Sequence, residues 1–91
     1  MTIEIFVDYM LQGREIEFSL GKEDYFLQPR YDDIAKNQVS LNVRYELYRL
    51  NISSSPLLIT DACVDELLKF DFGNGMSFLN SFKLFNIKCV L

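Results

Sequence analysis

The chain has 91 residues, of which 49% are hydrophobic and 14% aromatic. This length suits one domain, and the supply of core-forming side chains predicts that residues 1–91 fold together instead of staying disordered. The net charge is −4, and residues 1–33 alone carry −5, with eight acidic against three basic side chains. Because binding to a nucleic-acid backbone needs clustered cations, we expect no direct contact with DNA or RNA.

The sequence contains no apolar run near the roughly twenty residues that cross a bilayer, and no basic leader before an apolar block. We therefore expect no membrane association and a cytoplasmic location. The two cysteines, Cys63 and Cys89, lie in apolar periodic segments. This placement favours buried free thiols, with a disulfide as the alternative.

The first predicted element is an amphipathic helix over residues 2–12. Thr2 can cap its start, and Gly13 can end it in a left-handed turn. Its apolar side chains recur three and four residues apart and so share one face of the helix. They are Ile3, Phe6, Val7, Met10 and Leu11.

An acidic β-hairpin is predicted over residues 14–27. In its first strand, apolar and polar side chains alternate, so that one face is apolar and the other negatively charged. The apolar set is Ile16, Phe18 and Leu20, and the polar set is Glu15, Glu17 and Ser19. Residues 21–24 are expected to form the turn and residues 25–28 the returning strand, which Pro29 weakens because it cannot donate a ladder hydrogen bond.

The longest alternation covers residues 39–48 and predicts a strand in the centre of the sheet. The polar residues 30–38 before it are expected to be a connection. A turn cluster at 51–56 separates this strand from a short strand at 57–59.

Thr60 or Asp61 is then expected to cap a helix that runs to Phe70. Its inward stripe consists of Val64, Leu67 and Leu68. After a glycine-rich break at 73–75, one or two helical turns are expected at 77–82, and alternation over 85–91 predicts a closing strand.

The order helix, hairpin, strand, strand, helix, strand predicts an α+β fold. We expect a small, mostly antiparallel sheet of about five strands with the helices packed on one face.

Catalytic chemistry has little support in this sequence. The chain has no histidine, so a Ser-His-Asp or Cys-His site is impossible within one chain, and two distant cysteines cannot build a four-ligand zinc site. A nucleophilic Cys63 at a helix start, acid/base work by Glu15 and Glu17, or a cation held by Asp32 and Asp33 with Asp61, Asp65 or Glu66 remain minor alternatives. We expect a protein that is not an enzyme and binds no cofactor or metal.

The acidic N-terminal part is the main functional clue. Carboxylates on strands and turns can occupy lysine- and arginine-rich grooves that normally hold phosphates, and flanking tyrosines can anchor such a contact. The alternative is a solvated outer strand face. The predicted partner-binding residues are Glu15, Glu17, Glu23, Asp24, Tyr25, Tyr31, Asp32 and Asp33.

Residues 11–18, the Gly21-Lys22 turn, Tyr25-Phe26 and residues 65–70 resemble segments of short proteins from AT-rich Gram-positive bacteria and their mobile elements. Size, acidity and composition are also similar to phage- and plasmid-borne anti-CRISPR proteins and to toxin-neutralising immunity proteins. These likenesses imply a non-enzymatic antagonist, encoded by a phage or other mobile element, in a bacterial or infected bacterial cell. It would bind the basic surface of a nucleic-acid-processing enzyme through an acidic face. The alternatives are an immunity protein that uses the same surface, and a self-associating module whose C-terminal strand pairs with a second copy, so the protein is expected to be a monomer or a homodimer.

Overall fold

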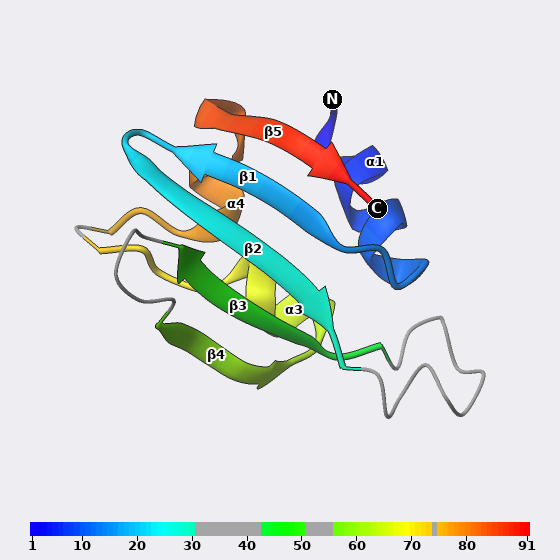
Figure 1. Ribbon diagram of the computed structural model, residues 1–91. Coiled ribbons are helices and arrows are strands. Elements are labelled where there is room, and N and C mark those ends of the chain that lie inside the picture. The colour runs from blue at the N-terminus through cyan, green and yellow to red at the C-terminus, as the bar shows by residue number, and fades with distance from the viewer. Residues whose placement is uncertain (31–42, 51–55, 74) are drawn as a thin grey trace.

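A computed structural model of the protein describes residues 1–30, 43–50, 56–73 and 75–91. They form one antiparallel five-stranded sheet in the spatial order β4-β3-β2-β1-β5, with short helices on one face (Figure 1). The predicted α+β class is thereby confirmed. Within the described segments, no helix is long and apolar enough to span a membrane.

Helix α1 covers Ile3–Leu11, as the spacing of its apolar residues predicts. The hydroxyl oxygen of Thr2 accepts a hydrogen bond from the backbone N–H of Ile5 at 3.3 Å, which satisfies one of the donors left free at a helix start. Gly13 has a φ of 75°, a left-handed conformation that suits the end of a helix.

Strands β1 (Ile16–Leu20) and β2 (Glu23–Pro29) form the predicted hairpin. Leu20 lies opposite Glu23, so the turn consists of Gly21 and Lys22 alone, and the four-residue turn expected from the sequence is wrong. Gly21 has a φ of 63°, which is the conformation that tight hairpin turns require. The shorter turn brings Glu23 and Asp24 into β2.

Strand β3 (Tyr45–Leu50) lies between β2 and β4, while β2 is the middle strand of the sheet. The first four residues of the predicted strand, 39–42, lie outside the described residues. Val43, Tyr45 and Leu47 are all fully buried, which confirms the predicted alternation in this part of the chain.

Strand β4 (Leu57–Ala62) is longer than expected, and helix α3 (Val64–Leu68) is shorter. The predicted N-cap at Thr60 or Asp61 is wrong, because both residues belong to β4 and Cys63 precedes the helix. Asp61 is instead bound by Arg44, whose Nε lies 2.6 Å from Asp61 Oδ1, and Ala62 is paired with Tyr45 in the sheet. These contacts extend the strand beyond the point where local sequence favours a helix.

The C-terminal part contains helix α4 (Phe78–Ser81), the 3₁₀ turn η1 (Phe82–Leu84) and strand β5 (Phe85–Val90), as predicted. Ser77 caps α4 by accepting a hydrogen bond from the backbone N–H of Asn80 at 3.1 Å. Both cysteines are free thiols, but Cys89 on β5 is exposed and Cys63 is only partly buried. The expectation that both thiols are buried is therefore wrong.

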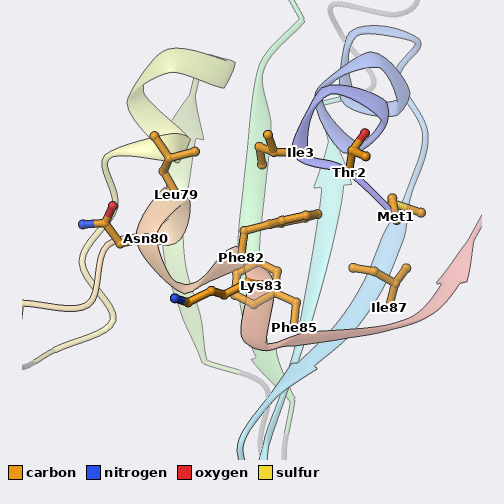
Figure 2. Close-up of a pocket in the computed structure, with 9 residues that line it drawn as sticks. All are labelled: Met1, Thr2, Ile3, Leu79, Asn80, Phe82, Lys83, Phe85 and Ile87. Carbon is orange, nitrogen blue, oxygen red and sulfur yellow. The ribbon is translucent and has the colours of Figure 1, made fainter.

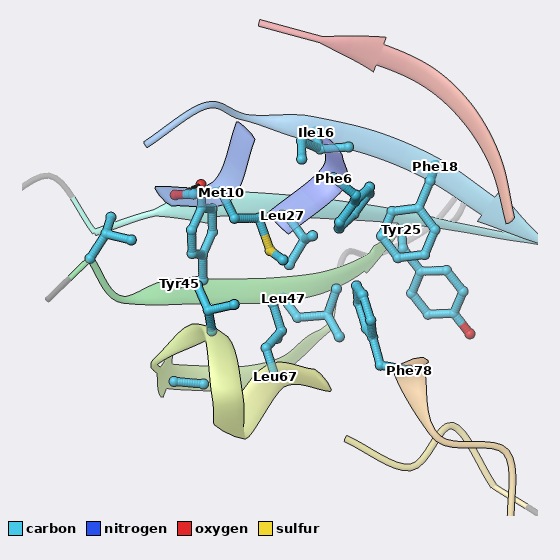
Figure 3. Packing of buried hydrophobic residues seen from close by; sticks show 13 residues of the cluster. Phe6, Met10, Ile16, Phe18, Tyr25, Leu27, Tyr45, Leu47, Leu67 and Phe78 are labelled. Atoms are coloured by element: carbon cyan, nitrogen blue, oxygen red, sulfur yellow. Dashed lines mark hydrogen bonds between the residues drawn. The ribbon is translucent and has the colours of Figure 1, made fainter. Parts of the chain in front are cut away.

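The core fills the space between the sheet and the helices (Figure 3). Aromatic rings dominate its centre: the rings of Phe18 and Phe85 stack with centroids 4.3 Å apart, and Phe6 from α1 packs edge-on to Phe82 at 5.1 Å. Such ring pairs add to the stabilisation that burial alone provides. The side chains that alternate with these core residues along the strands point to the opposite face of the sheet.

Candidate functional site

The sheet face opposite the described helices is called here the open face (Figure 1). Residues that lie directly opposite one another in an antiparallel ladder share a face, so the ladder of β1, β2 and β3 fixes which side chains lie on it. On these strands the open face carries Glu17, Ser19, Asp24, Phe26, Gln28, Glu46, Tyr48 and Leu50.

A row of three side chains crosses the middle of the open face. Phe26 on β2 lies opposite Glu17 on β1 and opposite Tyr48 on β3. The two aromatic residues are partly buried by their neighbours, yet neither belongs to the core cluster or packs against it. The row therefore presents apolar ring surface beside a carboxylate, a combination common at recognition surfaces.

Two contacts organise the charges around this row. The hydroxyl of Tyr48 donates a hydrogen bond to Glu46 at 3.4 Å, and partial burial together with this carboxylate raises the pKa of Tyr48. The ammonium group of Lys88, on β5, donates to Asp24 across β1 at 2.7 Å, which raises the pKa of Lys88. Three carboxylates, of Glu17, Asp24 and Glu46, thus share the face with this lysine, and the local balance stays negative.

Beyond Gln28 and Glu46, the charges at the end of the sheet are balanced by ion pairs. Asp61 is bound by Arg44 at 2.6 Å and by Arg30 at 3.3 Å, and Arg44 also reaches Glu66 on α3 at 3.1 Å. The hydrogen bond from Arg44 lowers the pKa of Asp61, and the backbone N–H of Cys63 lowers the pKa of Glu66. This cluster ties the residues next to β2 and β3 to β4 and α3, so its role is structural.

The structure disperses the residues predicted to bind a partner. Glu17 and Asp24 lie on the open face, Glu15 is partly buried just before β1, and Glu23 is exposed at the start of β2 beside the turn. The other acidic and aromatic candidates after β2, namely Tyr31, Asp32 and Asp33, lie outside the described residues.

Tyr25 is not a surface anchor, so its proposed role as one is wrong. Only 6% of the residue is exposed, and its ring stacks on Phe18 at 5.4 Å and meets Phe72 edge-on at 5.0 Å. Burial raises the pKa of its hydroxyl. The reason is its position opposite Phe18, which places it on the helix-covered face of the sheet.

Sequence reasoning missed Phe26 and Glu46 as members of the site. The signal was the alternation along residues 25–28: Tyr25 and Leu27 share one face of β2, so Phe26 lies on the other face, opposite Glu17. Tyr48 was expected on the outer strand face, and it lies there partly buried.

Cys63 lies at the start of α3, where a reactive thiol was a minor alternative. It borders a small depression of about 140 Å³ together with Leu11, Val64 and Asp65. Reactive cysteines sit in electropositive surroundings, whereas this one has carboxylates at Asp65 and Glu66, and its backbone N–H donates to Glu66 at 3.0 Å. In the segments that the structure describes, no three potential metal ligands of the His, Cys, Asp or Glu type gather at one point.

Comparison with known proteins does not place the chain in a group. No protein-family model matches the sequence, and no curated protein or solved structure is significantly similar to it. The open face is therefore the feature from which a function can be inferred.

Proposed function

We propose that the protein is a non-enzymatic antagonist that binds a basic surface of another protein through its open face. The observation that carries this proposal is the row of Glu17, Phe26 and Tyr48, flanked by the carboxylates of Asp24 and Glu46. The aromatic side chains supply contact area, and the carboxylates steer the approach of a cationic partner.

The proposed partner is a nucleic-acid-processing enzyme, as for anti-CRISPR proteins. Grooves that hold nucleic acid are lined by lysine and arginine, and the three carboxylates that the open face presents can take the place of phosphates there. An immunity protein that neutralises a toxin would use the same surface, and the identity of the partner separates the two.

The test begins with affinity capture from a bacterial lysate and continues with purified partner and calorimetry. A variant with Glu17→Lys and Glu46→Lys is expected to bind at least about tenfold more weakly than the unchanged protein, because each reversal replaces attraction with repulsion. Affinity is also expected to fall with rising salt.

The matched control reverses two acids on exposed positions of α1, Glu4→Lys and Asp8→Lys, and so makes the same change in net charge. It is expected to change affinity less than about twofold if the open face is the contact. Equal losses in both variants would show that net charge alone matters. A partner whose affinity does not respond to salt would refute the proposed mechanism.

A further inference from the structure

A separate apolar groove lies on the helix side of the sheet, beside β5 (Figure 2). It has a volume of about 860 Å³, within the range of about 300–1,000 Å³ that is usual for small-molecule sites. Its walls come from the start of α1, from α4 with η1, and from β5, so both ends of the chain contribute. The groove shares no residue with the open face, and a ligand bound there would be independent of the partner proposed above.

Apolar side chains make up most of the groove wall. Phe82 and Phe85 contact the core through Phe6, with ring centroids 5.1 Å and 6.4 Å away, yet both stay only partly buried. The outer side of the core is therefore open at this point, and apolar ligand surface bound there would be removed from water. The apolar lining residues are Met1, Ile3, Leu79, Phe82, Phe85 and Ile87.

The polar groups of the groove lie toward one end. Figure 2 shows Asn80 and the ammonium end of Lys83 on one side of the groove, with Met1 and Ile87 on the other. Lys83 is the only charged side chain in the lining, and within the described segments it forms no ion pair. The third polar lining residue, Thr2, uses its hydroxyl to cap α1. The groove thus has a cationic end and an apolar end.

This division selects the chemistry of the occupant. A cation would be repelled by Lys83, and a sugar or nucleotide needs more hydrogen-bond partners than the side chains of Asn80 and Lys83 offer. An alkyl chain has no polar group along its length that apolar walls would leave without a partner. A carboxylate at its end can accept a charge-assisted hydrogen bond from the ammonium group of Lys83.

We infer that the groove binds a fatty acid, a carboxylate that carries one long alkyl chain. The carboxylate lies at the ammonium group of Lys83 and the side-chain amide of Asn80. The alkyl chain covers the rings of Phe82 and Phe85 and ends beside Ile87. The site holds the monomeric ligand, because its walls belong to three elements of one chain.

The probe is sodium dodecanoate, at concentrations at which light scattering detects no micelles. In the ¹⁵N-labelled protein it is expected to shift the backbone amide signals of residues 2–3 and 79–87, with a dissociation constant below about 0.5 mM. Octanoate is expected to bind at least about tenfold more weakly, because four methylene groups lose contact. Dodecyltrimethylammonium has the same alkyl chain and a cationic head, and is expected to bind the groove about fivefold more weakly.

Two matched pairs of protein variants locate the contact. Lys83→Met is expected to weaken dodecanoate binding by about threefold to fivefold, whereas Lys69→Met, at an exposed lysine outside the lining, leaves it unchanged. Leu79→Ser is expected to weaken binding by about threefold, while Leu84→Ser, at a similarly exposed residue outside the lining, does not. Circular dichroism verifies that each variant stays folded.

Thermal melts separate specific binding from surfactant action. A ligand of the folded state raises the melting midpoint, so dodecanoate is expected to raise it. A lowered midpoint, or the absence of shifts in residues 79–87, would remove the inference. Equal affinity of Lys83→Met and the unchanged protein for dodecanoate would overturn the carboxylate contact.

Two other results would assign the groove to a different occupant. Co-sedimentation with vesicles of dioleoylphosphatidylglycerol, without binding of monomeric dodecanoate, would make it a membrane contact. A dimer in light scattering that dissociates when dodecanoate is added would assign the groove to a second copy of the chain. A monomer that binds dodecanoate and does not co-sediment with the vesicles is the result expected here.

Discussion

The hydroxyl oxygen of Tyr45 lies 2.9 Å from the carbonyl oxygen of Met10 and thereby joins β3 to the end of α1. The same hydroxyl oxygen lies 2.8 Å from the carbonyl oxygen of Arg14, so its one proton is shared between two acceptors. Both carbonyls belong to the segment where α1 ends and the hairpin begins. This contact fixes the helix against the sheet although the residues are far apart in sequence.

Tyr45→Phe is expected to lower the free energy of unfolding by about 1–2 kcal/mol, because the carbonyl oxygens of Met10 and Arg14 lose a buried donor. Urea denaturation measures the change. Tyr48→Phe is the matched control: its hydroxyl binds only Glu46, at 3.4 Å on the open face, and its removal is expected to cost less than about 0.5 kcal/mol. Equal costs for the two variants would contradict a structural role for the Tyr45 hydroxyl.

Stability is expected to fall at alkaline pH through Tyr45. Burial, assisted by the charge of Glu15, raises the pKa of Tyr45 far above its ordinary value of 10.0. The folded state then keeps the proton that the unfolded state loses, so the stabilisation is complete below the ordinary pKa and decreases as the pH rises above it. The loss is about 1.4 kcal/mol per pH unit for one such group.

Denaturation midpoints at about pH 9 and about pH 11 test this expectation, since these values bracket the ordinary pKa of tyrosine. Tyr45→Phe is expected to lose less stability between these two pH values than the unchanged protein, because the variant lacks the phenol proton of Tyr45. An identical loss in both proteins would show that Tyr45 does not contribute.

Acid is expected to weaken the junction of β4 and α3. The hydrogen bond from Arg44 lowers the pKa of Asp61, so the unfolded state takes up its proton first as the pH falls. The stabilisation is present above the ordinary carboxyl pKa and disappears as the pH falls through the lowered one. Asp61→Asn is expected to reduce stability at about pH 6 and to flatten its acid dependence, as followed by thermal melts. Glu23→Gln, at an exposed strand end, is the control and is expected to keep the dependence unchanged.

Phe18→Ala is expected to cost about 3–5 kcal/mol, a large part of the stability of a domain of this size. Phe18 is fully buried, and its ring contacts those of Phe6, Tyr25, Phe78 and Phe85, so truncation opens a cavity at the centre of the core. Chemical denaturation measures the loss. Phe26→Ala, on the neighbouring strand but on the open face, removes the same atoms and is expected to cost less than half as much.

Local periodicity in the sequence determined the class of fold. Alternation in β1 and around Tyr45 identified strands with one buried face, and the spacing of apolar residues with Thr2 before them identified α1. These signals are local, because each depends on the geometry of a few neighbouring residues. They also identified Glu17 as a residue of the outer face.

Tertiary contacts decided what local signals left open. The two-residue turn set the register of β2, which places Tyr25 opposite Phe18 and Phe26 opposite Glu17, and packing against Phe18 and Phe72 buried Tyr25. Arg44 held Asp61 in β4 and delayed the start of α3. The groove beside β5 joins residues from both ends of the chain, so no single segment encodes it. The sequence by itself thus specified which residues alternate, and long-range packing specified which face, edge and groove they form, because those choices depend on partners distant along the chain.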